Sequence, residues 1–83
     1  MTQETTTQEI FQTYDMGCAA GLVSVGFELK SLDRSNPQKV LFCFKYEVDI
    51  EEAADDYFVD KLQINARTYF DNIKMLKNRI YTN

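Results

Sequence analysis

The chain has 83 residues and is acidic, with 13 Asp and Glu side chains against 9 Lys and Arg and a formal net charge of −4. This charge argues against a general nucleic-acid binder, which is normally basic overall. The chain contains no histidine, so it lacks the commonest general base and the commonest metal ligand. With 45% hydrophobic and 13% aromatic residues, it can fold around one small core.

The first residues predict no packed structure. Residues 1–8 are mostly Thr, Gln and Glu without hydrophobic periodicity, so we predict a disordered tail followed by a single domain over residues 9–83. This segment also lacks the basic and apolar regions of a signal peptide, and no apolar run in the chain reaches membrane-spanning length. We therefore expect a cytoplasmic, reduced protein that does not enter a membrane.

A short strand and a helix are predicted next. Residues 9–14 (EIFQTY) mix β-branched and aromatic side chains, which favours a strand. Asp15 is a good N-cap for a helix over residues 16–25, and Gly26 suits the left-handed position that ends a helix. One side of this helix carries only small side chains, at Gly17, Ala20, Gly21 and Ser24. Such a smooth side permits close approach of a sheet or another helix, which must offset the cost of the glycines.

The middle of the chain predicts an antiparallel hairpin. Residues 27–34 alternate, with an irregularity near Lys30 and Ser31, and residues 35–38 (SNPQ) are turn formers. Residues 39–48 (KVLFCFKYEV) are the strongest strand in the chain. Its apolar residues fall on alternate positions and share one face: Val40, Phe42, Phe44, Tyr46 and Val48. A two-stranded hairpin is marginal in water, so we expect residues 9–14 or a dimer to extend the sheet.

Two helices follow. Asp49 and Glu52 have the spacing of a capping box, and the helix should run to about Lys61. The apolar set of this helix is Ile50, Ala53, Ala54, Tyr57, Phe58 and Leu62. Asn65 should cap a last helix over residues 66–81. One buried stripe is expected along it, formed by Tyr69, Ile73, Leu76 and Ile80.

These elements predict an α+β fold in the order β-α-β-β-α-α. A small antiparallel sheet of two or three strands should be covered on one face by three helices. The first strand can lie beside residues 39–48, which gives the sheet order 1-3-2. We expect the Phe42, Phe44 and Tyr46 rings to belong to the core, because three amphipathic helices need an apolar surface to cover; the competing interpretation is a base-stacking surface.

No arrangement typical of catalysis is present. Cys18 and Cys43 lie in different elements and form no CxxC pair, so we expect buried free thiols and no zinc site. With three glycines in the chain there is no glycine-rich phosphate loop, and without histidine a Ser or Cys nucleophile would lack its usual base. We expect no enzyme, no cofactor and no metal.

Acidic side chains crowd the first of the two late helices. They are Glu51, Glu52, Asp55, Asp56 and Asp60. The simplest interpretation is a solvated helix face, and the functional alternative is a docking surface for a basic protein, for which Glu51, Glu52, Asp55 and Asp56 are the candidates. A divalent cation is disfavoured, because such sites usually draw ligands from a loop or from several elements.

The last helix is basic. Residues 64–83 carry four basic side chains and one acidic one. Arg67, Lys74, Lys77 and Asn78 fall on one side, with Tyr81 alongside, and Arg79 completes the candidates for contact with nucleic-acid phosphates. The same side chains could equally lie beside the acidic helix of the same molecule.

The order of several short motifs resembles a known family. These are Tyr14-Asp15, the Ala-rich helix ending Gly26-Phe27, Phe42-x-Phe44, Asp56-Tyr57, Phe70 and Leu76-Lys77. Over roughly residues 10–81 the chain resembles a family of short bacterial and phage proteins catalogued as a domain of unknown function. Members often have Asp-Pro ahead of the last helix, where this chain has Asn65-Ala66. The resemblance implies a prokaryotic or phage setting and supplies no catalytic residue.

From these observations we expect a small non-catalytic protein-interaction module or modulator of a bacterium or mobile element. Its partner is an unidentified protein, and a homodimer through a sheet edge or through the smooth first helix is a companion expectation. The alternative is a nucleic-acid-associated accessory protein that uses the basic last helix.

Overall fold

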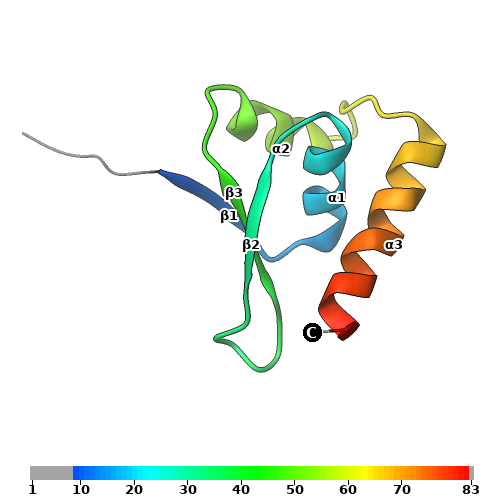
Figure 1. The fold of residues 1–83 in the computed structure, drawn as a ribbon. Helices are drawn as coiled ribbons and strands as arrows, with labels where there is room; N and C mark the ends of the chain where they lie inside the picture. The colour runs from blue at the N-terminus through cyan, green and yellow to red at the C-terminus, as the bar shows by residue number, and fades with distance from the viewer. Residues whose placement is uncertain (1–8, 83) are drawn as a thin grey trace, which may run out of the picture.

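A computed structural model describes residues 9–82 as three strands and three helices (Figure 1). The predicted tail, residues 1–8, lies outside the described residues, as does Asn83. The elements are β1 (Ile10–Thr13), α1 (Met16–Ser24), β2 (Leu29–Asp33), β3 (Leu41–Lys45), α2 (Ile50–Phe58) and α3 (Ala66–Thr82). Their order, β-α-β-β-α-α, is the predicted one.

The strands form one antiparallel sheet in the order β1-β3-β2. The prediction of a third strand and of the order 1-3-2 is therefore confirmed. Phe44 lies opposite Phe11 of β1 and opposite Leu29 of β2. The register of β2 shifts between Leu29 and Ser31, which is the irregularity that the broken alternation indicated. The extra residue there is Lys30.

The core lies on one face of this sheet. Phe42 and Phe44 are 2% and 0% exposed, and Tyr46 is half-buried against the same cluster. Two parts of the strand prediction are wrong. The strand is shorter than residues 39–48, and Val48 is 85% exposed. The reason is a turn, closed by the Ile50 amide donating to the Glu47 carbonyl at 3.0 Å, which leads the chain away from the sheet into α2.

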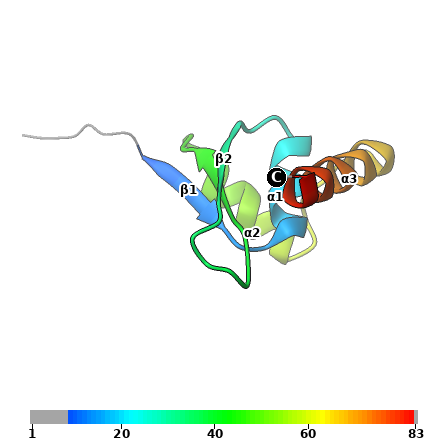
Figure 2. The ribbon, with the colours of Figure 1, turned by 60° about the horizontal axis from the view of Figure 1, so that its bottom comes forward.

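All three helices lie on the same side of the sheet (Figures 1 and 2). Figure 2 shows α1 between the strands and α3. Residues 18–22 of α1 are all buried in this position. The smooth side of α1 is covered by the chain itself, because Gly17 faces Tyr57 and Tyr69 while Gly21 faces Leu62 and Ile64. The expected close approach is confirmed.

Both ends of α1 follow the prediction. The Asp15 carboxylate accepts a hydrogen bond from the Cys18 amide at 2.8 Å, which caps the first turn. At the other end, Gly26 has φ 107°. Its amide donates to the Val23 carbonyl and the Phe27 amide donates to the Leu22 carbonyl, both at 3.0 Å. This pair of bonds is a Schellman motif, in which glycine takes the left-handed position.

Helix α2 differs from the prediction at both ends. Asp49 is the N-cap, but its side chain makes no capping hydrogen bond, so the expected capping box is absent. The helix ends at Phe58 rather than near Lys61 because Asp60 has φ 66°. The Lys61 amide then donates to the Asp56 carbonyl at 2.8 Å, which closes a second Schellman motif. Phe58 was expected in the core and is 60% exposed.

Helix α3 carries the predicted apolar stripe. Leu76 is 0% exposed, and Tyr69, Ile73 and Ile80 pack against the core from half-buried positions. The Asn65 carbonyl accepts the Tyr69 amide at 3.0 Å, so the helix begins where predicted. Leu76 thus anchors the outermost helix in the core.

Candidate functional site

The acidic residues of α2 stay on the surface, with one partial exception. Glu51, Glu52 and Asp55 are exposed, whereas Asp56 is half-buried. The charge of Glu51 raises the pKa of the Tyr46 hydroxyl, so the acidic face reaches the end of β3. Asp60, which the sequence grouped with this face, lies beyond the end of the helix. Within residues 9–82 no group of three acidic or cysteine side chains is close enough together to hold a metal ion.

The basic residues of α3 are divided between two sides of the helix. Arg67 lies 3.9 Å from Asp71, measured from Nε to Oδ2, and the Lys74 ammonium lies 4.9 Å from the centre of the Phe70 ring. Lys77 is exposed on the same outer side. The pitch of an α-helix turns Arg79 about 140° away from Lys74. Arg67, Lys74 and Lys77 therefore share one side of α3, and the fourth candidate, Arg79, lies apart from them.

Arg79 lines a different hollow, which the sequence did not indicate. It faces β2 across a shallow depression of about 470 Å³ that is also lined by Lys30, Leu32 and Arg34. The Arg34 guanidinium binds the end of α3 directly. Its Nη2 donates to the Arg79 carbonyl at 2.8 Å and its Nη1 to the Ile80 carbonyl at 3.0 Å. Arg34 thus joins the hairpin to the last turn of α3.

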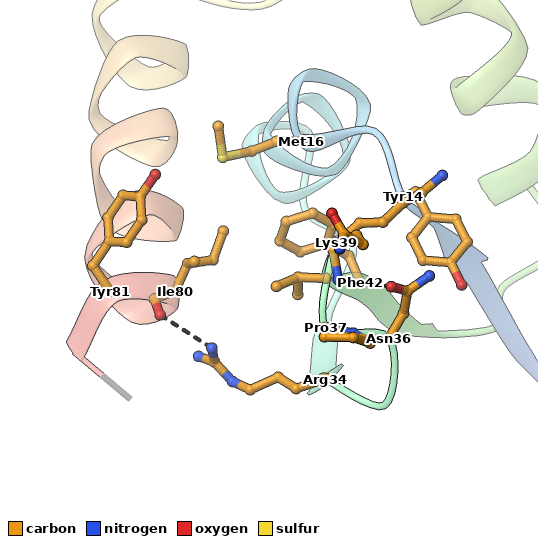
Figure 3. A pocket seen from close by; sticks show the side chains of 11 residues that line it. Tyr14, Met16, Arg34, Asn36, Pro37, Lys39, Phe42, Ile80 and Tyr81 are labelled. Atoms are coloured by element: carbon orange, nitrogen blue, oxygen red, sulfur yellow. Dashed lines mark hydrogen bonds between the residues drawn. The ribbon is translucent and has the colours of Figure 1, made fainter.

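A second hollow, also of about 470 Å³, opens on the other side of Arg34 (Figure 3). We call it the hairpin pocket, because the β2–β3 turn forms one wall. The start of α1 and the last turn of α3 form the other walls. Figure 3 shows Tyr14 and Tyr81 on opposite sides of the opening, with Phe42 between them. The apolar lining includes Met16, Pro37, Val40, Phe42 and Ile80.

The polar lining of the hairpin pocket includes two cations, Arg34 and Lys39, and two neutral amides, Asn36 and Gln38. In the part of the chain that the structure describes, no acidic residue lines it. The Lys39 ammonium lies 4.7 Å from the centre of the Tyr14 ring, which is a cation–π contact. Asp15 and Asp33 are next in sequence to the lining residues Tyr14, Met16 and Arg34, and both carboxylates accept hydrogen bonds from nearby residues. Asp15 accepts from the Cys18 amide and so caps α1, and Asp33 accepts from the Ser35 amide and hydroxyl at 2.8 and 2.6 Å. These Ser35 bonds lower the pKa of Asp33.

The outer edge of β1 is a third surface. The Tyr46 amide donates to the Glu9 carbonyl at 3.2 Å. Paired positions alternate along an antiparallel ladder, so Phe11 and Thr13 also bond to β3 while the backbone groups of Ile10 and Gln12 point outward. Among the described residues nothing pairs with that edge, since β1 is the terminal strand of the sheet (Figure 2).

The two sheet edges differ in their protection. β2 has Lys30, a register shift and Asp33, which are features that discourage further strand pairing. β1, with the sequence IFQT, has no charge, no proline and no register shift. Ile10 is 51% exposed on the sheet face that the helices leave open. β1 is therefore the edge that can accept another strand.

Neither thiol is available for chemistry at the surface, because Cys18 and Cys43 are both buried and unbridged, as predicted. Burial raises the pKa of the Cys18 thiol to about 11, and the nearby Asp15 carboxylate contributes to the rise. A hydrogen bond with Tyr69 raises the pKa of Tyr57 to about 12, with burial as a second cause. These groups are protonated near neutral pH.

Sequence reasoning missed the hairpin pocket because its residues come from three distant segments. Tyr14, Arg34, Lys39 and Tyr81 share no spacing that a motif search could use. The only sequence signal was Tyr81, identified as a side chain that could stack on a base. The bare edge of β1 was closer to prediction, since the sequence already indicated a sheet that needs extension.

Comparison with known proteins adds one finding. The family model of a domain of unknown function (DUF5659) matches residues 8–82. No curated protein and no solved structure matches the chain. None of the helices between residues 9 and 82 combines the length and the apolar character needed to cross a bilayer. Since the match spans both the sheet and the three helices, the chain belongs to the DUF5659 family.

Proposed function

We propose that the chain is a small non-catalytic protein-interaction module, and that it binds an extended segment of a partner protein along the edge of β1. The observation that carries this proposal is the outward direction of the Ile10 and Gln12 backbone groups on an edge without protection. Adding a strand there would satisfy those groups with main-chain hydrogen bonds, which is a recurrent way of binding peptides.

Side chains beside this edge would give the interaction its selectivity. An added strand would place alternate residues on the open face next to Ile10 and Gln12, and the others next to Phe11 and Thr13. The net charge of −4 favours a basic partner. The acidic side chains of α2 (Glu51, Glu52, Asp55 and Asp56) would attract such a partner over a longer range.

The non-catalytic part of the proposal rests on the chemistry of the chain. It has no histidine, and the raised pKa keeps the Cys18 thiol protonated near neutral pH.

A second copy of the chain can also use the β1 edge, which would join two sheets. The other route expected for a homodimer, the smooth side of α1, is covered by Tyr57 and Leu62 of the same chain.

The variant Gln12→Pro tests the edge. The Gln12 amide points away from β3, so proline removes a donor that a partner strand needs and leaves the ladder to β3 in place. Ala66→Pro is the matched control, because Ala66 is the exposed first residue of α3, where proline is tolerated. Partners captured from a lysate of the host are identified by mass spectrometry, purified and titrated against wild type and both variants.

We expect Gln12→Pro to weaken the partner by about tenfold or more, with Ala66→Pro binding like wild type. Hydrogen exchange at Ile10 and Gln12 should slow in the complex. A partner that binds Gln12→Pro as tightly as wild type, or leaves both amides exchanging as before, would rule out the β1 edge. Light scattering decides whether the partner strand comes from a second copy.

A second candidate function is nucleic-acid binding by the outer side of α3. Lys74 and the Phe70 ring lie together there, next to the exposed Lys77 and Arg67. Binding of labelled DNA or RNA should then weaken steeply with salt. It should weaken again in the Lys74→Glu/Lys77→Glu variant, whereas Arg79→Glu, on another side of the helix, should change it less. No binding at low salt would eliminate this function.

A further inference from the structure

We infer that the hairpin pocket binds a small organic anion that carries a flat apolar ring. This site is separate from the β1 edge in its residues, its chemistry and its test. It is formed by the β2–β3 turn, the start of α1 and the end of α3 (Figure 3). The charge of its lining, the apolar side chains below the opening and its volume each support the inference.

Charge is the first reason. The chain carries 13 acidic side chains, yet none of those within residues 9–82 lines this pocket, while Arg34 and Lys39 do. The nearby carboxylates of Asp15 and Asp33 accept hydrogen bonds from their own neighbours. A hollow lined by cations in an acidic protein concentrates a field that attracts anions.

The apolar part of the lining is the second reason. Phe42 is 2% exposed and lies beneath the opening, with Met16 and Ile80 partly buried beside it. Tyr14 and Tyr81, which are 48% and 80% exposed, stand on opposite sides. A flat ring can lie against the apolar side chains and face the tyrosines, whereas a bare inorganic anion would leave that surface wet.

The arrangement of donors is the third reason. Arg34 is held in position by its two hydrogen bonds to the end of α3 and keeps further N–H groups free. Lys39 is held over the Tyr14 ring. Figure 3 shows the two cations on opposite sides of the pocket, so a carboxylate or a phosphate can bind the oriented Lys39 ammonium while the charge of Arg34 adds to the field, with the attached ring beside Phe42. The volume of about 470 Å³ suits a ligand of this size.

The experiment uses the full chain labelled with ¹⁵N and follows backbone amide shifts during titration. Indole-3-acetate, indole-3-acetamide and tryptamine present the same ring with a negative, neutral and positive group. Adenosine 5′-monophosphate and adenosine form a second pair, which distinguishes a phosphate from a carboxylate as the preferred anion. We expect at least one anion to shift the amides of Met16, Arg34, Lys39 and Tyr81 at millimolar concentration, and its neutral relative to bind more weakly.

Two variants test the named groups. Lys39→Gln should weaken the binding of that anion by about three- to tenfold, while Lys61→Gln, which removes an exposed lysine outside the pocket, should not. Tyr81→Ala changes a side chain that is 80% exposed, so it should weaken ring binding and leave the fold intact.

The inference is overturned if neither anion shifts the lining amides, if tryptamine binds as tightly as indole-3-acetate, or if Lys39→Gln and Lys61→Gln bind alike. Preference for the phosphate or for the carboxylate identifies the ligand class.

Discussion

The Tyr57 hydroxyl of α2 occupies the place where the first side-chain atom of any larger residue at Gly17 would have to lie. The Tyr57 ring carbon next to that hydroxyl and the Tyr69 hydroxyl would lie 3.1 and 3.2 Å from the same atom. Tyr69 also donates a hydrogen bond to the Gly17 carbonyl at 3.2 Å. A single glycine therefore sets how closely the three helices approach one another.

Gly17→Ala should lower the free energy of unfolding by about 1–2 kcal/mol, because the clash exceeds the gain of about 1 kcal/mol in helix propensity. Urea unfolding measures this change. In a Tyr57→Phe background the hydroxyl is absent, so the same substitution should cost clearly less. Gly21→Ala is the comparison, since its nearest neighbours are the ends of the flexible Leu62 and Ile64 side chains, at 3.2 and 3.5 Å, and the Tyr57 ring lies at 3.6 Å, an ordinary contact distance. Equal costs at the two glycines would contradict this account.

Asp60→Gly should stabilise the protein by about 0.5–1 kcal/mol, because Asp60 has φ 66°, where glycine is free of the steric cost paid by other residues. Asp55→Gly removes the same charge from the interior of α2 and should destabilise by about 1 kcal/mol. Thermal or urea unfolding compares the two variants. If both variants changed the free energy of unfolding in the same direction, the loss of charge, and not the backbone conformation, would dominate at Asp60.

Arg34→Ala should loosen the last turn of α3, because it removes both hydrogen bonds to the Arg79 and Ile80 carbonyls. A cation at the end of a helix also stabilises the helix dipole, so we expect a loss of about 1 kcal/mol. Faster hydrogen exchange of the last amides of α3 is the direct measurement. Arg67→Ala should have almost no effect, because the Arg67 side chain is 89% exposed and its ion pair spans 3.9 Å.

Alkaline pH should destabilise the protein through Cys18. Its pKa rises from 9.0 to about 11 on folding, so the folded protein binds this proton more tightly than the unfolded chain does. The resulting stability is fully present below pH 9 and is lost as the pH rises toward 11. Urea unfolding across this range should show a steeper decline for wild type than for Cys18→Ala. Parallel curves would show that the thiol does not titrate in this way.

The sheet and the helix order followed from local patterns that need no tertiary information. Alternation over Val40–Tyr46 identified β3, and small residues at Gly17 and Gly21 indicated close packing of α1. The errors lie where tertiary context decides. Val48 continues the alternation but follows a turn, and Phe58 continues the apolar pattern of α2 but points into solvent.

The candidate sites were harder to predict for the same reason. Arg79 was grouped with Lys74 by charge, although the helix turns the two apart. The hairpin pocket joins Tyr14, Arg34 and Tyr81, which lie far apart in sequence and meet only in the folded chain, where Arg34 binds the end of α3. Patterns of spacing describe one element at a time, so they cannot reveal a site assembled from three.

The burial of α1 has a practical consequence for engineering. Its central residues contact the strands on one side and the other helices on the opposite side, so nearly every substitution there would disturb both neighbours. Three kinds of surface take no part in that packing: the outer edge of β1, the outer sides of α2 and α3, and the opening of the hairpin pocket. New recognition surfaces can therefore be grafted onto the exterior while α1 is kept unchanged as a spacer.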